Sequence, residues 1–438
     1  MLNWATFLWL LVLAIFAGQQ IIKGRRHSVY FVLPVFFMFC GLPLFLDEIF
    51  GRPGYLNKPG FALASADETT GIIYCLYMAL VPVILLCFGK PKLKMSGATT
   101  NSGYAPRGNR SAKQKKTRTW IICWMVLLSP IVLVCLSPLP AEYLTFSDTL
   151  RFSDSYDEFH TYVTLASNLA ALAGAYLIAV STPRVPGRWP RLGTLAAVTV
   201  FMLLAVWIHG KRNIVVIMAV LALMALHHRG LLKGVRAAVL IVASLIVVFG
   251  YSFFFQVHTE RVSTTWYENV RMDFGRDDAI KMTLFAELNP EVMRILEYRG
   301  QSLVFLVVSY VPRKLWPEKP LPYAQYFTSA LFLSSPRMWG WGMTTSWLEE
   351  AIANFSWLGM LLGPLCIALV CRAGDASGSV LGRILTPLVA CLLMLVHAIA
   401  FFPLLLLWFY VSVTDSFRNH KVDNLRRQNA AYESTLCP

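Results

Sequence analysis

The chain carries little charge for its length, and this scarcity excludes most soluble folds. Only 14% of its 438 residues are Asp, Glu, Lys or Arg, whereas 56% are hydrophobic. A soluble domain has roughly 25% charged residues. Mean hydropathy is +0.56, and long apolar runs recur from end to end. Most are long enough to cross a hydrocarbon core of about 30 Å. The composition therefore predicts a membrane protein.

Cysteine and metal-ligand patterns are also missing where they would matter. The nine cysteines lie almost entirely within or beside the apolar runs, so we expect neither a disulfide framework nor a zinc site. Asp273, Asp277 and Asp278 match no metal motif, and we predict no metal and no cofactor. The first apolar run lacks a basic start and a cleavage site, and we expect it to be retained as a span.

The apolar runs predict an all-α, polytopic integral membrane bundle of about ten or eleven spans. None of the 39 Lys and Arg residues falls inside a predicted span. A basic residue at a helix centre costs about 2.5–3.5 kcal/mol on insertion scales, so this segregation supports the assignment. The predicted spans are 4–22, 29–46, 71–89, 119–138, 160–181, 193–209, 213–227, 237–255, 351–371 and 384–413, the last crossing once or twice.

Basic residues in the short loops predict how the chain is oriented. One set of alternating loops holds twenty Lys and Arg residues and the other holds five, so the first set is expected in the cytoplasm. Its largest member, 90–118, has nine basic residues and no acid. We predict that it is a basic cytoplasmic linker beside anionic lipid headgroups. The net charge of +15 reflects this asymmetry, and no nucleic-acid partner is expected.

The orientation divides the chain into four parts. Residues 1–255 form the first eight spans, 256–350 a long external loop, 351–413 the C-terminal spans and 414–438 a basic tail. A single crossing by 384–413 would put that tail outside, against the charge rule. A hairpin near Pro403 would return it to the cytoplasm, and we favour the hairpin.

The long loop has features of an ordered structure. Residues 276–288 carry Ile280, Leu284 and Leu288 at four-residue spacing, which predicts an amphipathic helix on the membrane surface. Two apolar pieces, 302–311 and 328–333, are too short to span and are expected to dip into the interface or cover a cavity.

Between these pieces lies PRKLWPEKP, residues 312–320. Its three prolines stiffen the backbone, and Trp316 is suited to the headgroup level. Arg313 and Lys319 would then face the solution from a rigid loop. Guanidinium groups bind phosphate bidentately, best where water is partly excluded. A lipid with a phosphate head would present that head at this depth, and a sugar on its diphosphate is already activated for transfer. Transfer then needs stabilisation of the departing charge and a carboxylate for the acceptor proton.

Five ordered segments resemble the repeat-unit polymerases of O-antigen and exopolysaccharide, the Wzy family. They are LDEIFGRPGY, GKRN at 210–213, VRMDFGRDD, PRKLWPEKP and GWGMTTSWLEEAIANFSWLG. The resemblance implies a GT-C-like, metal-independent glycosyltransferase in the bacterial inner membrane, with 256–350 on the periplasmic side. It would move a growing glycan from one polyprenyl diphosphate to a second lipid-linked repeat unit. A chain-length regulator is the partner protein that such an enzyme would have.

The resemblance and the residues together give a candidate site. Arg212, Arg276 and Arg313 match local family patterns, although no external Arg here is followed by Gly eleven positions later, as in some members. Snorkelling or structural ion pairing is the simpler interpretation of such cations. The predicted diphosphate ligands are Arg212, Arg271, Arg276, Arg313 and Lys319.

Three carboxylates are candidates for the catalytic base. Glu349 begins an apolar run beside Glu350, where an acid also caps a helix. Asp277 follows Arg276, and Asp47 with Glu48 ends the second predicted span. His397 lies within an apolar run and is better explained as a core residue than as a proton relay.

Two other functions fit parts of the sequence. An O-antigen ligase or another lipid-linked-sugar transferase would use similar chemistry, but a ligase favours an external histidine, and His258 lacks matching surroundings. A flippase or transporter usually has repeated halves and charge at mid-depth, which the sequence does not show. A deletion strain separates them: single repeats on lipid indicate a polymerase, internal accumulation a flippase, and polymer left on the carrier a ligase.

Overall fold

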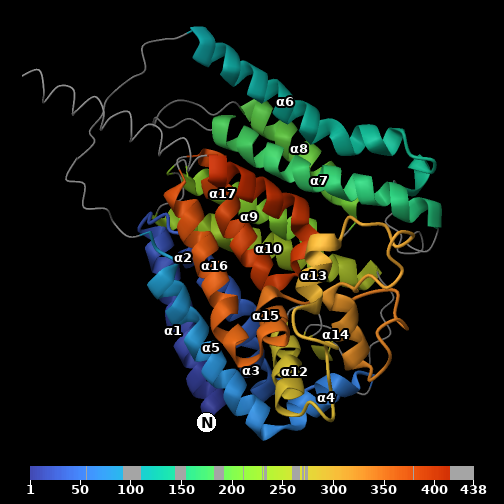
Figure 1. Ribbon diagram of the computed structural model, residues 1–438. Helices are drawn as coiled ribbons and strands as arrows, with labels where there is room; N and C mark the ends of the chain where they lie inside the picture. The colour runs from blue at the N-terminus through green and yellow to red at the C-terminus, as the bar shows by residue number, and fades with distance from the viewer. Residues whose placement is uncertain are drawn as a thin grey trace, which may run out of the picture. The chain divides into compact units, whose positions relative to one another are not determined.

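The computed structural model is all-helical over the residues it describes, with no strand among them (Figure 1). Those residues are 1–55, 57–91, 110–143, 154–181, 192–210, 212–228, 230, 234–258, 267–268, 271, 275–377 and 379–414. Five helical segments there are long and apolar enough to cross a membrane: Leu2–Ile22, Val29–Phe50, Glu68–Phe88, Arg118–Cys135 and Trp347–Ala376. The last of them is divided into two helices, Trp347–Phe355 and Gly359–Ala376. Six shorter apolar helices lie where most of the remaining spans are predicted. The total of ten or eleven spans stays a prediction.

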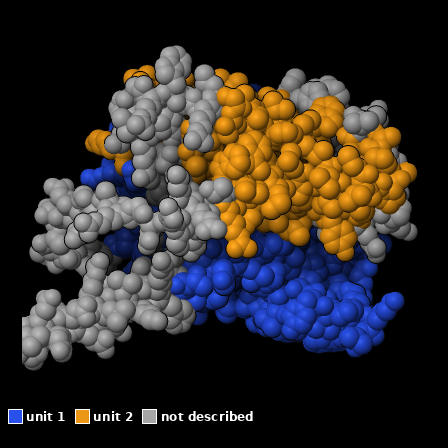
Figure 2. All heavy atoms as spheres, turned by 90° about the horizontal axis from the view of Figure 1, so that it is seen from above, with its two compact units in different colours: residues 1–21, 25–91, 263–438 blue, residues 22–24, 92–262 orange. Residues whose placement is uncertain are grey.

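The chain forms two compact units, coloured separately in Figure 2. Unit 2 consists of residues 22–24 and 92–262. Its helices are α6 (Arg110–Cys135), α7 (Asp154–Ser181), α8 (Leu192–His209), α9 (Arg212–His228) and α10 (Gly234–His258). Helix α7 packs against α6, α8 and α9. Its buried alanines, Ala170, Ala171 and Ala175 among them, permit this close packing because they have small side chains.

Unit 1 consists of residues 1–21, 25–91 and 263–438 and holds every predicted site residue except Arg212. Its first helices are α1 (Leu2–Ile22), a continuous helix made of α2 (Val29–Phe36), η1 (Phe37–Gly41) and α3 (Leu42–Phe50), then α4 (Pro59–Ala66) and α5 (Glu68–Phe88). The later ones are α12 (Asp277–Leu288), α13 (Gln301–Val308), α14 (Tyr323–Leu331), α15 (Trp347–Phe355), α16 (Gly359–Ala376) and α17 (Val380–Leu395), followed by a helix over 402–414.

The segment 256–350 contributes to a hydrophobic core, and this corrects one prediction. A helix does occupy 277–288, but it does not lie on the membrane surface with one exposed face. Every residue of α12 from Asp277 to Ala286 is buried, and the helix packs against α4, α5 and α15. The core around it includes Phe61 of α4, Met282 and Phe285 of α12, Phe327 of α14 and Ala353 of α15.

The apolar run at 351–371 is also divided differently from the prediction. Helix α15 ends at Phe355. The next residue, Ser356, has φ of 56°, and the chain reverses into α16. A Cβ on Gly359 would lie 2.1 Å from the Ala351 carbonyl oxygen, and one on Gly363 would lie 3.2 Å from the Ala351 Cβ and 3.6 Å from the Leu348 Cα. A later residue of α16 thus contacts an earlier residue of α15. The two helices are an antiparallel pair, so residues 351–355 do not continue the span.

The last apolar run, 384–413, folds as the favoured hairpin. Helix α17 ends at Leu395 and the next helix begins at Phe402. The Trp408 indole donates to the Thr386 hydroxyl at 2.9 Å, and a Cβ on Gly382 would contact Val411 at 3.4 Å. These two pairings run in opposite directions along the two helices. The turn lies at 396–401, just before Pro403. Pro403 lies in the first turn of the second helix, a position where proline is tolerated because no backbone N–H is needed there.

Candidate functional site

A π-helical turn in the middle of the second candidate span is hydrogen-bonded to the residue that precedes α12. Residues 37–41 form this turn, and two of its carbonyls accept hydrogen bonds from other segments of the chain. The Phe39 carbonyl accepts from the Arg276 N–H at 3.0 Å, and the Cys40 carbonyl accepts from the Tyr74 hydroxyl at 2.7 Å. Phe39 is the eleventh residue of the span Val29–Phe50, so the chain before α12 is docked beside the middle of that helix.

Arg276 therefore has a structural position. Its Nε donates to the carbonyl of Leu395, the last residue of α17, at 3.1 Å, and its backbone N–H holds the π-turn. One residue thus joins α12, the second span and the C-terminal hairpin. Its predicted role as a diphosphate ligand stays a prediction.

Arg271 is enclosed by three carboxylates. Its guanidinium donates to Asp47 at 2.9 and 3.1 Å, to Asp277 at 2.5 and 2.9 Å and to Asp278 at 3.0 Å. Only 2% of its side chain is exposed. Lys281 adds a contact of 2.8 Å with Asp277. We call Asp47, Arg271, Asp277, Asp278 and Lys281 the buried ionic cluster.

Two tyrosines donate hydrogen bonds to carboxylates of the buried ionic cluster. The Tyr267 hydroxyl donates to Asp47 at 2.5 Å, and the Tyr55 hydroxyl donates to Asp278. Burial by itself raises a carboxyl pKa, but Arg271 and Lys281 outweigh it and hold the pKa of Asp277 below its ordinary value. Burial raises the pKa of Asp278, because Arg271 offsets that effect only in part. Within this cluster the predicted bases Asp47 and Asp277 both bind the predicted ligand Arg271.

Glu349 closes the N-terminus of α15. It is fully buried, and its carboxylate accepts from the backbone N–H and the hydroxyl of Ser346, which form a capping box. Its neighbour Glu350 accepts from the Ser302 hydroxyl at 2.8 Å, and Asn354 donates to the same hydroxyl at 2.7 Å. The capping interpretation of Glu349 is confirmed.

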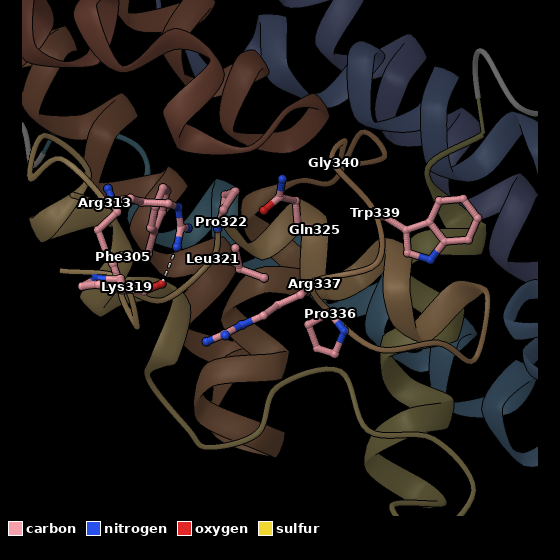
Figure 3. A pocket seen from close by; sticks show the side chains of 11 residues that line it. Phe305, Arg313, Lys319, Leu321, Pro322, Gln325, Pro336, Arg337, Trp339 and Gly340 are labelled. Atoms are coloured by element: carbon pink, nitrogen blue, oxygen red, sulfur yellow. Dashed lines mark hydrogen bonds between the residues drawn. The ribbon is translucent and has the colours of Figure 1, made fainter.

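An open pocket of about 470 Å³ is lined by Arg313 and Lys319, the two cations predicted on the loop 312–320 (Figure 3). Arg313 donates to the carbonyls of Lys319 and Pro320 at 2.9 and 3.2 Å. Lys319 donates to the carbonyls of Ser309 and Val311 at 3.0 and 2.8 Å, and its ammonium lies over the Phe305 ring. These bonds fix both cations, yet they occupy only two of the five N–H groups of Arg313 and two of the three of Lys319.

Arg337 is a third cation of this pocket that the sequence reasoning missed. In Figure 3 its side chain extends toward the side that carries Arg313 and Lys319. Gln325, Trp339 and Gly340 line the wall as well. A sequence signal existed: Pro336-Arg337 is followed by Trp339, much as Pro312-Arg313 is followed by Trp316. Two similar Pro-Arg segments thus contribute to one pocket.

The remaining candidate, Arg212, begins α9 in unit 2. Its side chain lies outside the described part of the structure, so its predicted role as a ligand stays a prediction. No group of His, Cys, Asp and Glu within the described residues could hold a metal ion.

The pocket therefore brings together Arg313, Lys319 and Arg337, whereas Arg271 and Arg276 are bound elsewhere in unit 1. No protein-family model, curated protein or solved structure matches this chain. The functional argument consequently depends on the chemistry of the pocket.

Proposed function

We propose that this chain is a membrane enzyme that binds a lipid through an anionic, phosphate-bearing head. More particularly, we propose a polymerase of polysaccharide repeat units. It transfers a growing glycan from a polyprenyl diphosphate to a second lipid-linked repeat unit. The proposal includes a GT-C-like helical bundle in a bacterial inner membrane, with residues 256–350 on the outer side.

The observation that carries this proposal is the group of three cations around one pocket. Arg313, Lys319 and Arg337 supply three positive charges, and the adjacent Glu318 supplies one negative charge. The two positive charges that remain match the two negative charges of a diphosphate esterified at both ends. Two of the three cations are held by backbone carbonyls before any ligand arrives, and such preorganisation favours binding of a fixed anion.

The wall of the pocket suits a sugar next to that anion. Gln325 offers an amide that can donate and accept, and Trp339 adds an aromatic side chain to the lining. Phe305, Leu321 and several prolines supply apolar lining. Oriented hydrogen bonds on an apolar wall are typical of small-ligand sites.

The test is chain-length analysis of glycan made by the purified protein in liposomes that contain lipid-linked repeat units. Wild-type protein should give a ladder of polymers. Arg313→Ala and Arg337→Ala should each lower kcat/KM about 10–100-fold, since a hydrogen bond to a charged group is worth about 1.5–3 kcal/mol. Arg313→Lys should also be impaired, because an ammonium cannot reproduce the guanidinium fork.

Arg294→Ala is the matched control, because Arg294 is exposed on the same segment and does not line the pocket. It should polymerise at the wild-type rate. Wild-type ladders from both pocket variants would exclude this pocket as the diphosphate site.

A transporter of lipid-linked glycan is the second candidate, and one observation favours it. The buried ionic cluster lies in the same part of unit 1 as the π-turn of the second span, and transporters often combine buried charge with interrupted helices. Trapping of single repeat units on the cytoplasmic side of a deletion strain would favour this alternative over the polymerase.

A further inference from the structure

Glu318 is the carboxylate that stands beside the pocket cations. It lies between Pro317 and Lys319, which both line the pocket, and 73% of its side chain is exposed. Its Oε2 accepts from Nη2 of Arg337. Arg337, 67% exposed, lines the same pocket. One cation therefore belongs both to the pocket and to this carboxylate.

The bond between these two side chains is easy to exchange. An exposed ion pair contributes little to stability, because water and salt screen its charges. A phosphate offers the same guanidinium several oxygens and a greater charge, in a geometry that permits two parallel hydrogen bonds. A diphosphate held by Arg313 and Lys319 would thus compete successfully with Glu318 for Arg337.

Exchange would change the basicity of Glu318. Hydrogen bonding and the charge of Arg337 hold the pKa of this carboxyl below its ordinary value. Loss of that partner raises the proton affinity of the carboxylate, which makes it a better general base.

We propose that Glu318 takes the proton of the acceptor hydroxyl, and that binding of the diphosphate frees Glu318 by drawing Arg337 away. This inference depends on the proposed function. In the step, the acceptor oxygen forms a bond to the anomeric carbon of the donor sugar. The bond from that carbon to the diphosphate oxygen breaks, its electron pair leaves with the diphosphate, and the hydroxyl proton passes to Glu318. Arg313, Lys319 and Arg337 stabilise the departing charge.

The three carboxylates named from the sequence are less suited to this role. Asp47 and Asp277 are bound to Arg271, and Glu349 is bound to Ser346. All three are buried in these contacts. A base must reach the proton it removes within hydrogen-bond distance, and Glu318 is exposed beside the pocket.

Glu318→Gln tests the inference in the liposome assay. This change removes the base and keeps the size of the side chain. We expect kcat to fall about 100-fold or more, as for loss of a general base, with KM unchanged or lower because the amide competes less for Arg337. The fall of the rate toward acid pH should disappear. Glu291→Gln, on an exposed carboxylate outside the pocket, should behave as wild type.

Arg337→Ala gives a second readout. It should raise KM, and it should move the acid limb of the pH profile of kcat/KM, which reports the free enzyme, to higher pH, because Glu318 then regains its ordinary proton affinity. Wild-type kcat and an unchanged profile for Glu318→Gln would overturn the inference, and so would equal loss of substrate binding and turnover. Both results leave a polymerising wild type, whereas failure of the proposed function means that the wild type itself makes no polymer.

Discussion

At the scale of single residues, Arg271 has the largest predicted effect on stability. It is the cation common to Asp47, Asp277 and Asp278. Arg271→Ala leaves three buried carboxylates with Lys281 alone. Breaking a buried pair from one side costs about 3–5 kcal/mol, and we expect a loss of that size in denaturant unfolding of the protein in nanodiscs. Arg271→Lys should recover only part of it, because an ammonium cannot bridge the three carboxylates.

The same experiment needs a cation outside any buried network. Arg294 is exposed, and Arg294→Ala should change the free energy of unfolding by less than about 0.5 kcal/mol. If Arg271→Ala unfolds at the wild-type midpoint, the buried ionic cluster contributes little to stability. Arg271 would then again be a candidate for binding a ligand.

The buried ionic cluster also shows how far residue-level prediction could go. Structural ion pairing of Arg271, with Asp277 among the possible partners, could be inferred from the sequence, but Asp47 was a candidate only for the base. Asp47 and Arg271 are separated by 224 positions, and only the fold brings them together. Arg313 and Lys319 could be placed at one site because they belong to a single proline-stiffened loop. Arg337, on a second loop, could not be joined to them in the same way.

At the scale of elements, the α15–α16 pair predicts a graded series of glycine variants. Gly359→Ala would place Cβ 2.1 Å from the Ala351 carbonyl oxygen, and Gly363→Ala would place it 3.2 Å from the Ala351 side chain. Backbone cannot yield as a flexible side chain does. We expect Gly359→Ala to cost more than about 3 kcal/mol and Gly363→Ala about 1 kcal/mol, measured by thermal unfolding in nanodiscs.

Gly71→Ala in α5 is the control of that series, since a Cβ there meets nothing within 4 Å. It should be neutral or slightly stabilising because alanine favours a helix. Equal stability of all three variants would mean that α15 does not fold back on α16 but continues its axis.

Burial of α12 is tested by thiol labelling of the folded protein, in a variant that has no other cysteine. Ile280→Cys should stay unlabelled until denaturation, because Ile280 is fully buried, whereas Val292→Cys should react at once, because 57% of Val292 is exposed. Rapid labelling at position 280 would support a surface helix after all. The sequence predicted the helix from Ile280, Leu284 and Leu288 but placed it wrongly. Its polar face carries Asp277 and Lys281, which meet buried partners instead of water.

At the scale of the whole molecule, hydropathy was the most informative signal. The all-helical class and the positions of most apolar helices agree with the prediction, because each depends on local composition. Reversals within an apolar run were harder to predict. The hairpin over 384–413 was suggested by the charge of the tail and by Pro403, whereas the reversal at Ser356 has no proline and no charge, only Gly359 three positions later.

The sidedness of these reversals can be measured with three single-cysteine variants at exposed positions: Val292→Cys, Ala376→Cys and Thr414→Cys. An antiparallel hairpin of α17 with the following helix puts positions 376 and 414 on the same side. The charge asymmetry of the loops puts that side in the cytoplasm and position 292 outside. A membrane-impermeant maleimide added to intact cells should therefore label only Val292→Cys, and the other two only after permeabilisation. Labelling of Thr414→Cys from outside would indicate a single crossing of 384–413. Protection of position 292 would place the three pocket cations in the cytosol, where no lipid-linked glycan exported for polymerisation could reach them.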